Sequence, residues 1–100
     1  MINARILLVD DDIQSLSSTQ KILERQGYEV ETAYDGREGL NKIRESLKSR
    51  KKYDLLLTDI RMPHLNGIEL LKAVKACGSD VPVVLMTAFG EVTEAVWAMK

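Results

Sequence analysis

The sequences ILLVDDD (residues 6–12) and LLLTD (residues 55–59) are the two stretches that decide the fold. Each is an apolar run of strand length that ends in carboxylates, and strands buried on both faces of a parallel sheet have such runs. If the two runs are neighbouring parallel strands, their carboxyl ends bring at least three acids into the crevice where open α/β sheets bind ligands. Carboxylates within about 4–6 Å raise one another's pKa unless a cation or a proton intervenes. The cluster therefore indicates chemistry rather than stability.

Strand and helix patterns alternate along the chain, which favours a parallel sheet covered on both faces. The predicted strands are Arg5–Val9, Glu29–Ala33, Tyr53–Thr58 and Val81–Thr87. The predicted helices are Asp12–Gln26, Gly36–Lys48, a third from the N-cap Asn66 to Gly78, and a fourth from about Glu91 to Lys100. Polar and apolar residues alternate in the second strand, which predicts that it lies at the sheet edge.

The composition fits one small domain that spans residues 1–100, because 45% of the 100 residues are hydrophobic. The formal charge of −1 gives no field of one sign, so we expect neither nucleic-acid binding nor membrane binding by this domain. No apolar stretch approaches the roughly 20 residues that span a bilayer. The single cysteine, Cys77, cannot form an internal disulfide, and no leader-like segment precedes the first strand. We therefore expect a cytoplasmic protein.

Three motifs follow one another along the chain: VDD at residues 9–11, TDIRMP at residues 58–63 with Asn66-Gly67 behind it, and VLMTA at residues 84–88. Together, and each at the end of its own predicted strand, they resemble the receiver domain of bacterial two-component response regulators. The resemblance implies a flavodoxin-like, three-layer α/β/α fold whose parallel strands lie in the order 2-1-3-4.

The resemblance also implies roles for single residues. Asp59 would be the phosphoacceptor that takes a phosphoryl group from a sensor histidine kinase, and a carboxylate suits that role because it is ionised at neutral pH. Asp11, Asp59 and the backbone carbonyl of Arg61 would bind Mg²⁺ directly, with Asp10 binding it through water. Such a mixed oxygen site is what Mg²⁺ prefers.

Two residues after the fourth strand would sense the phosphoryl group. Thr87 would be the switch that donates a hydrogen bond to a phosphoryl oxygen, and Ala88 would leave room for that group. The inward movement of Thr87 would then shift the loop and helix that follow.

Nearby residues have plainer interpretations. Asp12 opens a helix and is predicted to be its cap rather than a metal ligand. His64 stands alone in a loop and is predicted to be exposed and inert. Cys77, near a helix end, is predicted to be a small buried hydrophobe.

Further stretches, TAFGEV at residues 87–92 and AVWAMK at residues 95–100, look most like receivers of the NtrC type, which belong to enhancer-binding transcription activators. In such a receiver Arg61 and Phe89 would flank the acceptor and shield the acyl phosphate from water. We therefore expect slow self-dephosphorylation and an output in transcription activation.

The chain departs from the family at its end. A complete receiver has a fifth strand with a lysine that pairs with the phosphoryl group, and then a fifth helix; we expect both to be absent, so that the domain is truncated and phosphorylation is weaker. The apolar residues 81–85 would then form an uncovered sheet edge. With Trp97 predicted on the exposed face of the fourth helix, we expect self-association through this helix and the fourth strand.

Two alternatives stay open. One is a structural or dimerising receiver-like module with little phosphorylation. The other is a phosphatase of the haloacid-dehalogenase type, because Asp10 and Asp12 fit its D-x-D motif, although Gln14 stands where that family has threonine or valine.

Overall fold

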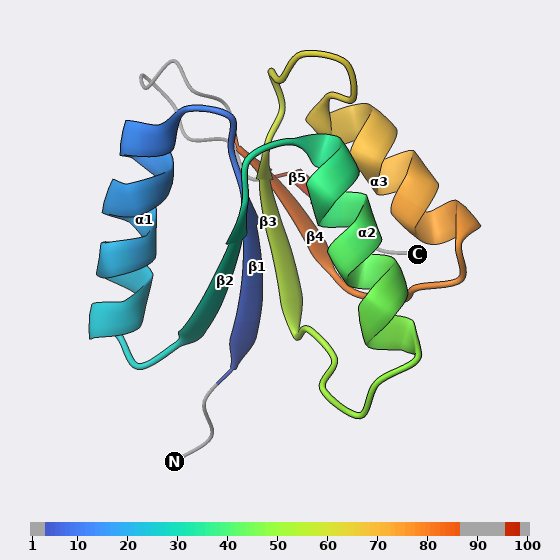
Figure 1. The fold of residues 1–100 in the computed structure, drawn as a ribbon, viewed down its shortest axis with the longest axis horizontal. Helices are drawn as coiled ribbons and strands as arrows, with labels where there is room; N and C mark the ends of the chain where they lie inside the picture. Colours follow the sequence, from blue (N-terminus) through green and yellow to red (C-terminus); the bar gives the residue numbers. More distant parts are fainter. Residues whose placement is uncertain (1–3, 87–95, 99–100) are drawn as a thin grey trace.

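A five-stranded sheet forms the centre of the molecule (Figure 1). The computed structural model describes residues 4–86 and 96–98. The strands are β1 (Arg5–Val9), β2 (Glu29–Ala33), β3 (Leu55–Asp59), β4 (Val83–Met86) and β5 (Val96–Ala98). They lie in the order β2-β1-β3-β4-β5, and the first four are mutually parallel. The predicted order 2-1-3-4 and the position of the second strand at the edge are therefore confirmed.

The first two strands have the predicted bounds, whereas the next two are displaced or shortened. β3 begins at Leu55 rather than Tyr53 because Asp54 contacts Arg5 of the neighbouring strand β1 in a way that regular strand pairing does not. Its carboxylate accepts the Arg5 backbone N–H at 2.7 Å, while its own N–H donates to the Arg5 carbonyl at 2.7 Å. A side chain thus replaces one backbone group at this end of the sheet, and regular pairing starts one residue later.

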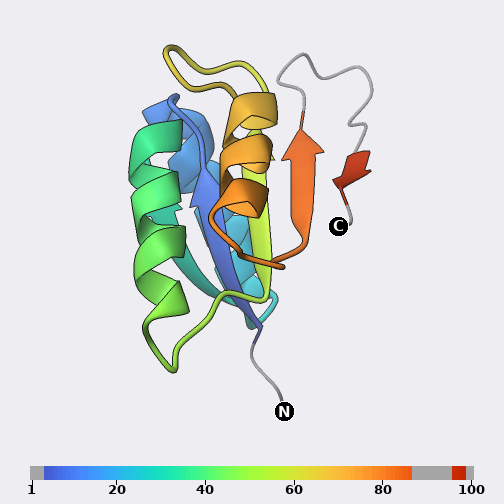
Figure 2. The same cartoon turned by 90° about the vertical axis from the view of Figure 1, so that its right-hand side faces the viewer.

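Within residues 4–86, three helices cover the sheet: α1 (Ile13–Arg25), α2 (Gly36–Leu47) and α3 (Gly67–Ala76). Each begins after a residue whose side chain accepts a backbone N–H of the first turn, namely Asp12, Asp35 and Asn66. Figures 1 and 2 show α1 on one face of the sheet and α2 beside α3 on the other, which gives the three-layer arrangement that was predicted.

The main core lies between the sheet and the pair α2 and α3. Alternate residues of each strand point to this side, so Leu7 and Val9 of β1 meet Leu56 of β3 in the core. The helices contribute Ile43, Leu70 and Val74, all fully buried. Burial of such side chains, at about 1.5–3 kcal/mol each, holds the strand ends and hence the acids that follow them in fixed positions.

The prediction for the last part of the chain is wrong where the structure describes it. Residues 96–98 form β5, which pairs antiparallel with β4 through Val83↔Ala98 and Leu85↔Val96, instead of continuing a helix. The fourth strand is therefore not an uncovered edge, and the helical-face argument for Trp97 does not hold. Self-association stays a prediction, but it can no longer rest on an unpaired edge of β4. The rest of the predicted helix lies outside the described residues.

This outcome has a physical reason. The free edge of β4 presents unpaired backbone N–H and C=O groups, and pairing with another strand satisfies them. Val96 and Trp97 have side chains that suit a strand as well as a helix. Tertiary pairing therefore outweighs the helical spacing of the apolar residues.

Among the described residues, no helix is both long and apolar enough to cross a bilayer.

Candidate functional site

The carboxyl ends of β1 and β3 lie side by side. In the parallel pairing, Val9 is the partner of Thr58, so the residues that follow them, Asp10 and Asp59, lie at the same level at the ends of the two strands. The two strands keep one register from Ile6↔Leu55 to Val9↔Thr58, and the side chains of Ile6 to Val9 are all buried. The sequence of two buried strands thus fixes where these two acids meet.

Three carboxylates gather at this end of the sheet. Asp10, Asp11 and Asp59 each offer an oxygen, and these oxygens all lie within 4.8 Å of one another. Asp10 is 8% exposed and Asp59 is 6% exposed, whereas Asp11 is open to solvent. The predicted acid cluster is therefore present, with two buried members and one that faces the outside.

Burial and mutual repulsion disfavour the charged form of the two buried acids. For Asp59, burial raises the pKa above its usual value, with a further contribution from the charge of Asp11, and hydrogen bonds from the backbone of Arg61 and Ile60 offset this in part. For Asp10, burial again raises the pKa most, and the nearby charge of Asp59 adds to it. The protein thus holds negative charge where a cation would relieve it.

The Asp59 carboxylate has an open coordination position. Its Oδ1 is buried and has no hydrogen-bond partner within the described part of the chain. A buried oxygen of this kind normally has a partner. With the oxygens of Asp10 and Asp11 close by, this donor set fits a hard divalent cation such as Mg²⁺, which binds carboxylate oxygens and retains waters.

Asp12 is excluded from the cluster and caps α1, as predicted. Its side chain accepts the backbone N–H of Gln14 at 3.0 Å and the hydroxyl of Ser15 at 3.1 Å. Its own N–H donates to Oδ1 of Asp10 at 3.0 Å. Asp12 therefore serves the helix with its carboxylate and orients Asp10 with its backbone.

Three further residues that were singled out from the sequence, Arg61, His64 and Cys77, lie outside the acid cluster. Arg61 is exposed, and its backbone N–H contacts the Asp59 carboxylate; a role for its carbonyl stays a prediction. His64 is exposed, as predicted, but has a positive φ of 70°. Cys77 is half-buried and its thiol donates to the Val74 carbonyl at 3.1 Å, which is a structural contact.

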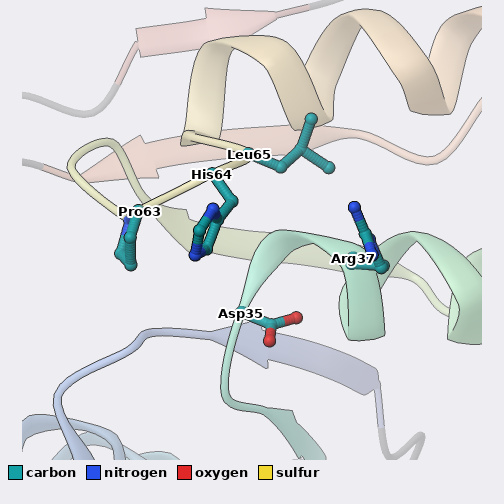
Figure 3. Close-up of a pocket in the computed structure, with 5 residues that line it drawn as sticks. All are labelled: Asp35, Arg37, Pro63, His64 and Leu65. Carbon is teal, nitrogen blue, oxygen red and sulfur yellow. The ribbon is translucent and has the colours of Figure 1, made fainter.

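A small cavity of about 300 Å³ lies beside the loop that joins β3 to α3. Figure 3 shows the loop residues Pro63, His64 and Leu65 facing Asp35 and Arg37 at the start of α2. None of the clustered acids lines it. The cavity marks the contact between the loop and α2.

Thr87 and Ala88, together with Phe89, lie outside the described residues. The chain leading to them is described as far as Met86, which is the pairing partner of Asp59. The Met86 carbonyl accepts the N–H of Ile60 at 2.9 Å. The roles predicted for Thr87, Ala88 and Phe89 stay predictions.

Sequence reasoning missed how closely the backbone of Asp59 is packed. The buried Thr58 hydroxyl donates to the Asp59 carbonyl at 3.0 Å, and Gly67 lies directly against the same peptide. The pair Asn66-Gly67 gave a signal for the helix start, but a glycine inside the first turn was itself a sign that something approaches closely there.

Comparison with known proteins agrees with this geometry. A family model described as the response regulator receiver domain matches residues 6–100. The transcriptional regulatory protein ZraR of Escherichia coli (strain K12) is 42% identical over 98 residues, which is 98% of this chain and 21% of ZraR. A CpxR homolog of Haemophilus influenzae, also named a transcriptional regulatory protein, is 43% identical over 97 residues, covering 97% of this chain and 40% of that protein. The chain thus spans about a fifth of the length of ZraR.

Solved structures show the same fold. The response regulator TrrA of Thermotoga maritima, in complex with Mg(2+)-BeF, aligns with a TM-score of 0.76 and 33% identity, over 87% of this chain and 71% of that one. The receiver domain of the hybrid histidine kinase CckA aligns with a TM-score of 0.75 and 33% identity, over 88% of this chain and 79% of that one. The family match over nearly the whole chain replaces the phosphatase interpretation. The chain belongs to the response regulator receiver domain family of two-component systems.

Proposed function

We propose that Asp59 accepts a phosphoryl group from a phosphohistidine of a sensor histidine kinase and that residues 1–100 act as one receiver domain. The observation that carries this proposal is the buried, unpartnered Oδ1 of Asp59 beside Asp10 and Asp11. A structural or dimerising module would have no use for this arrangement, because three close carboxylates destabilise the metal-free fold.

In the proposed reaction, a carboxylate oxygen of Asp59 attacks the phosphorus atom. A P–O bond forms as the P–N bond to the donor imidazole breaks, and the electron pair of that bond goes to the imidazole nitrogen, which takes up a proton. The product is an aspartyl phosphate. No general base is needed, because the nucleophile is a carboxylate, which has no proton to lose when it attacks.

Mg²⁺ would be held by Asp11, Asp59 and the Arg61 carbonyl, with Asp10 in contact through water, and would spread the charge of the transferring phosphoryl group. The chain's own residues prepare the site. The N–H of Asp12 fixes one oxygen of Asp10 and so leaves its second oxygen for the site. The backbone N–H of Arg61 contacts the Asp59 carboxylate, while the Ile60 N–H donates to the Met86 carbonyl at 2.9 Å.

The conformational output would begin at Thr87 and Ala88, which follow β4 in the sequence. Thr87 would donate a hydrogen bond to a phosphoryl oxygen, and Ala88 would leave space for the group. Met86 pairs with Asp59, so a change at the acceptor acts on a strand that leads directly to Thr87. Arg61 and Phe89 would shield the acyl phosphate, which gives slow self-dephosphorylation.

The full protein would regulate transcription from the cytoplasm, because ZraR and the CpxR homolog are both named transcriptional regulatory proteins. The likeness to ZraR supports an NtrC-type output. Neither relative implies nucleic-acid contact by this domain, whose net charge is −1.

Labelling with acetyl phosphate and Mg²⁺, followed by intact mass measurement, tests the proposal. We expect one phosphoryl adduct in the wild-type protein, its loss in Asp59→Asn, and its retention in the matched control Asp12→Asn. A wild-type protein that takes no label, or a label that persists in Asp59→Asn, overturns the proposal.

A further inference from the structure

Gly67 lies against the backbone of the proposed acceptor. It is the first residue of α3 and is buried. A Cβ atom at this position would overlap the Asp59 carbonyl oxygen and would come within 2.9 Å of the Ile60 Cα. Both of these are backbone atoms, which cannot move aside as the end of a side chain can. Gly67 also donates its N–H to the Ile60 carbonyl at 2.9 Å.

Two further hydrogen bonds hold the same peptide. The Thr58 hydroxyl donates to the Asp59 carbonyl at 3.0 Å, and the Ile60 N–H donates to the Met86 carbonyl at 2.9 Å. Thr58 is fully buried. The peptide that joins Asp59 to Ile60 is therefore fixed between β4, a buried hydroxyl and the first turn of α3.

The first turn of α3 is itself anchored. Asn66 and Glu69 form a capping box, in which the Asn66 side chain accepts the Glu69 N–H at 2.8 Å and the Glu69 carboxylate accepts the Asn66 N–H at 2.9 Å. The box makes the first turn rigid, and the hydrogen bond from the Gly67 N–H to the Ile60 carbonyl ties that turn to the acceptor peptide. A side chain at residue 67 would therefore displace the acceptor peptide.

A similar contact lies near the α3 end of the loop that joins β3 to α3, and it supplies a control. Gly36, the first residue of α2, lies against Leu65, and a Cβ there would come within 2.5 Å of the Leu65 carbonyl oxygen. In Figure 3, Leu65 faces the start of α2. A methyl group at residue 36 therefore meets backbone just as one at residue 67 does, but six residues beyond the acceptor.

We propose that Gly67 is a positioning residue that, together with the Thr58 hydroxyl, sets where the Asp59 carboxylate lies relative to Asp10 and Asp11. The proposal rests on the acceptor and metal roles proposed above. A methyl group at residue 67 displaces the Asp59 peptide, strains its hydrogen bond with Thr58 and so misplaces the carboxylate. Changes that misorient a metal ligand typically reduce metal affinity about 10- to 100-fold.

The test compares Gly67→Ala with Gly36→Ala by Mg²⁺ titration, thermal unfolding and amide NMR spectra. We expect both variants to unfold at lower temperature. Gly67→Ala should lower Mg²⁺ affinity by about tenfold or more and shift the amide resonances of Asp10, Asp11 and Ile60 before any metal is added. Gly36→Ala should leave Mg²⁺ affinity close to that of the wild type.

A second pair of variants tests the proposal if Gly67→Ala does not fold. Thr58→Val keeps the shape of the buried side chain but removes the hydrogen bond to the Asp59 carbonyl, whereas Thr58→Ser keeps the hydroxyl. We expect Thr58→Val to weaken Mg²⁺ binding and Thr58→Ser to restore most of it.

Equal Mg²⁺ affinity in the wild type, Gly67→Ala and Thr58→Val overturns the positioning role. If the wild type binds Mg²⁺ and the variants weaken binding, but acetyl phosphate gives no label, the acceptor function fails and the positioning role stands. A wild-type protein that binds no Mg²⁺ overturns both.

Discussion

The backbone N–H of Asp12 donates a 3.0 Å hydrogen bond to Oδ1 of Asp10, although both residues carry carboxylates. The contact exists because the Asp12 side chain turns away to cap α1. Four acids therefore meet at the ends of two strands, but one of them serves the helix and the other three form the cluster. This division of roles leads to the first prediction.

Asp11→Asn should weaken Mg²⁺ binding strongly, whereas Asp12→Asn should leave it nearly unchanged. Asn caps a helix about as well as Asp does, so the second variant also keeps its stability, while Asp12→Ala should cost about 1 kcal/mol of the free energy of unfolding. Calorimetric Mg²⁺ titration and urea unfolding measure the two effects. Equal losses of Mg²⁺ affinity in Asp11→Asn and Asp12→Asn would contradict the assignment.

Asp59→Asn should stabilise the metal-free protein at neutral pH. Burial and the charge of Asp11 raise the pKa of Asp59, so its ionised form is less favourable in the folded protein than in the unfolded chain, and a neutral amide removes this cost. We expect a higher urea midpoint with an unchanged slope. Addition of Mg²⁺ should then stabilise the variant less than the wild type.

The exposed Asp80 provides the control for this prediction. Asp80→Asn removes the same charge at a position outside the cluster, so the urea midpoint should change little. A lower midpoint in Asp59→Asn than in the wild type would show that the carboxylate stabilises the metal-free fold.

The sequence was sufficient to predict the site where buried strands determine it. The apolar runs predicted β1 and β3 as buried strands, and the resemblance to receiver domains implied that they are neighbours, which places Asp10 beside Asp59. Gly67 could not be assigned its contact, because sequence spacing does not say which backbone a glycine touches. Residues 96–98 were mispredicted for a related reason: their strand pairing depends on the edge of β4 and not on their own periodicity.

Glu31→Gln should flatten the acid side of the stability profile. Burial alone would raise the pKa of Glu31, but hydrogen bonds from Tyr53 and Arg5 outweigh it, and the pKa lies below the usual 4.5. A lowered pKa contributes stability that is present above the unfolded value and is lost as pH falls through the folded value. Urea unfolding from neutral pH down through about pH 4.5 should show this loss in the wild type and not in the variant.

Glu29→Gln is the matched control for Glu31→Gln. Glu29 lies on the same strand and reaches Arg5 at 3.6 Å, but its side chain is 59% exposed. Exposed ion pairs contribute little, so this variant should keep the acid dependence of the wild type. Identical acid profiles for Glu31→Gln and the wild type would show that the contacts with Tyr53 and Arg5 do not bind the ionised form more tightly.

Tyr53→Phe should remove a loss of stability at alkaline pH. Burial, and then the hydrogen bond of 3.0 Å to Glu31, raise the pKa of Tyr53 from 10.0 to about 12. Between these two values the unfolded chain releases the phenolic proton while the folded protein retains it, so wild-type stability falls across this window. The variant lacks the proton and should not show this fall, although at neutral pH it should be about 1 kcal/mol less stable without the hydrogen bond.

The contact with Arg5 should survive this substitution, since the guanidinium lies 4.3 Å from the ring centroid and Phe keeps the ring. Tyr34→Phe, at a side chain that is 54% exposed, is the control and should retain the wild-type profile. Urea unfolding at about pH 8, 10 and 11 distinguishes the outcomes, because the free-energy difference between Tyr53→Phe and the wild type should shrink as pH rises. A constant difference across that range would mean that Glu31 does not hold the phenolic proton in the folded protein.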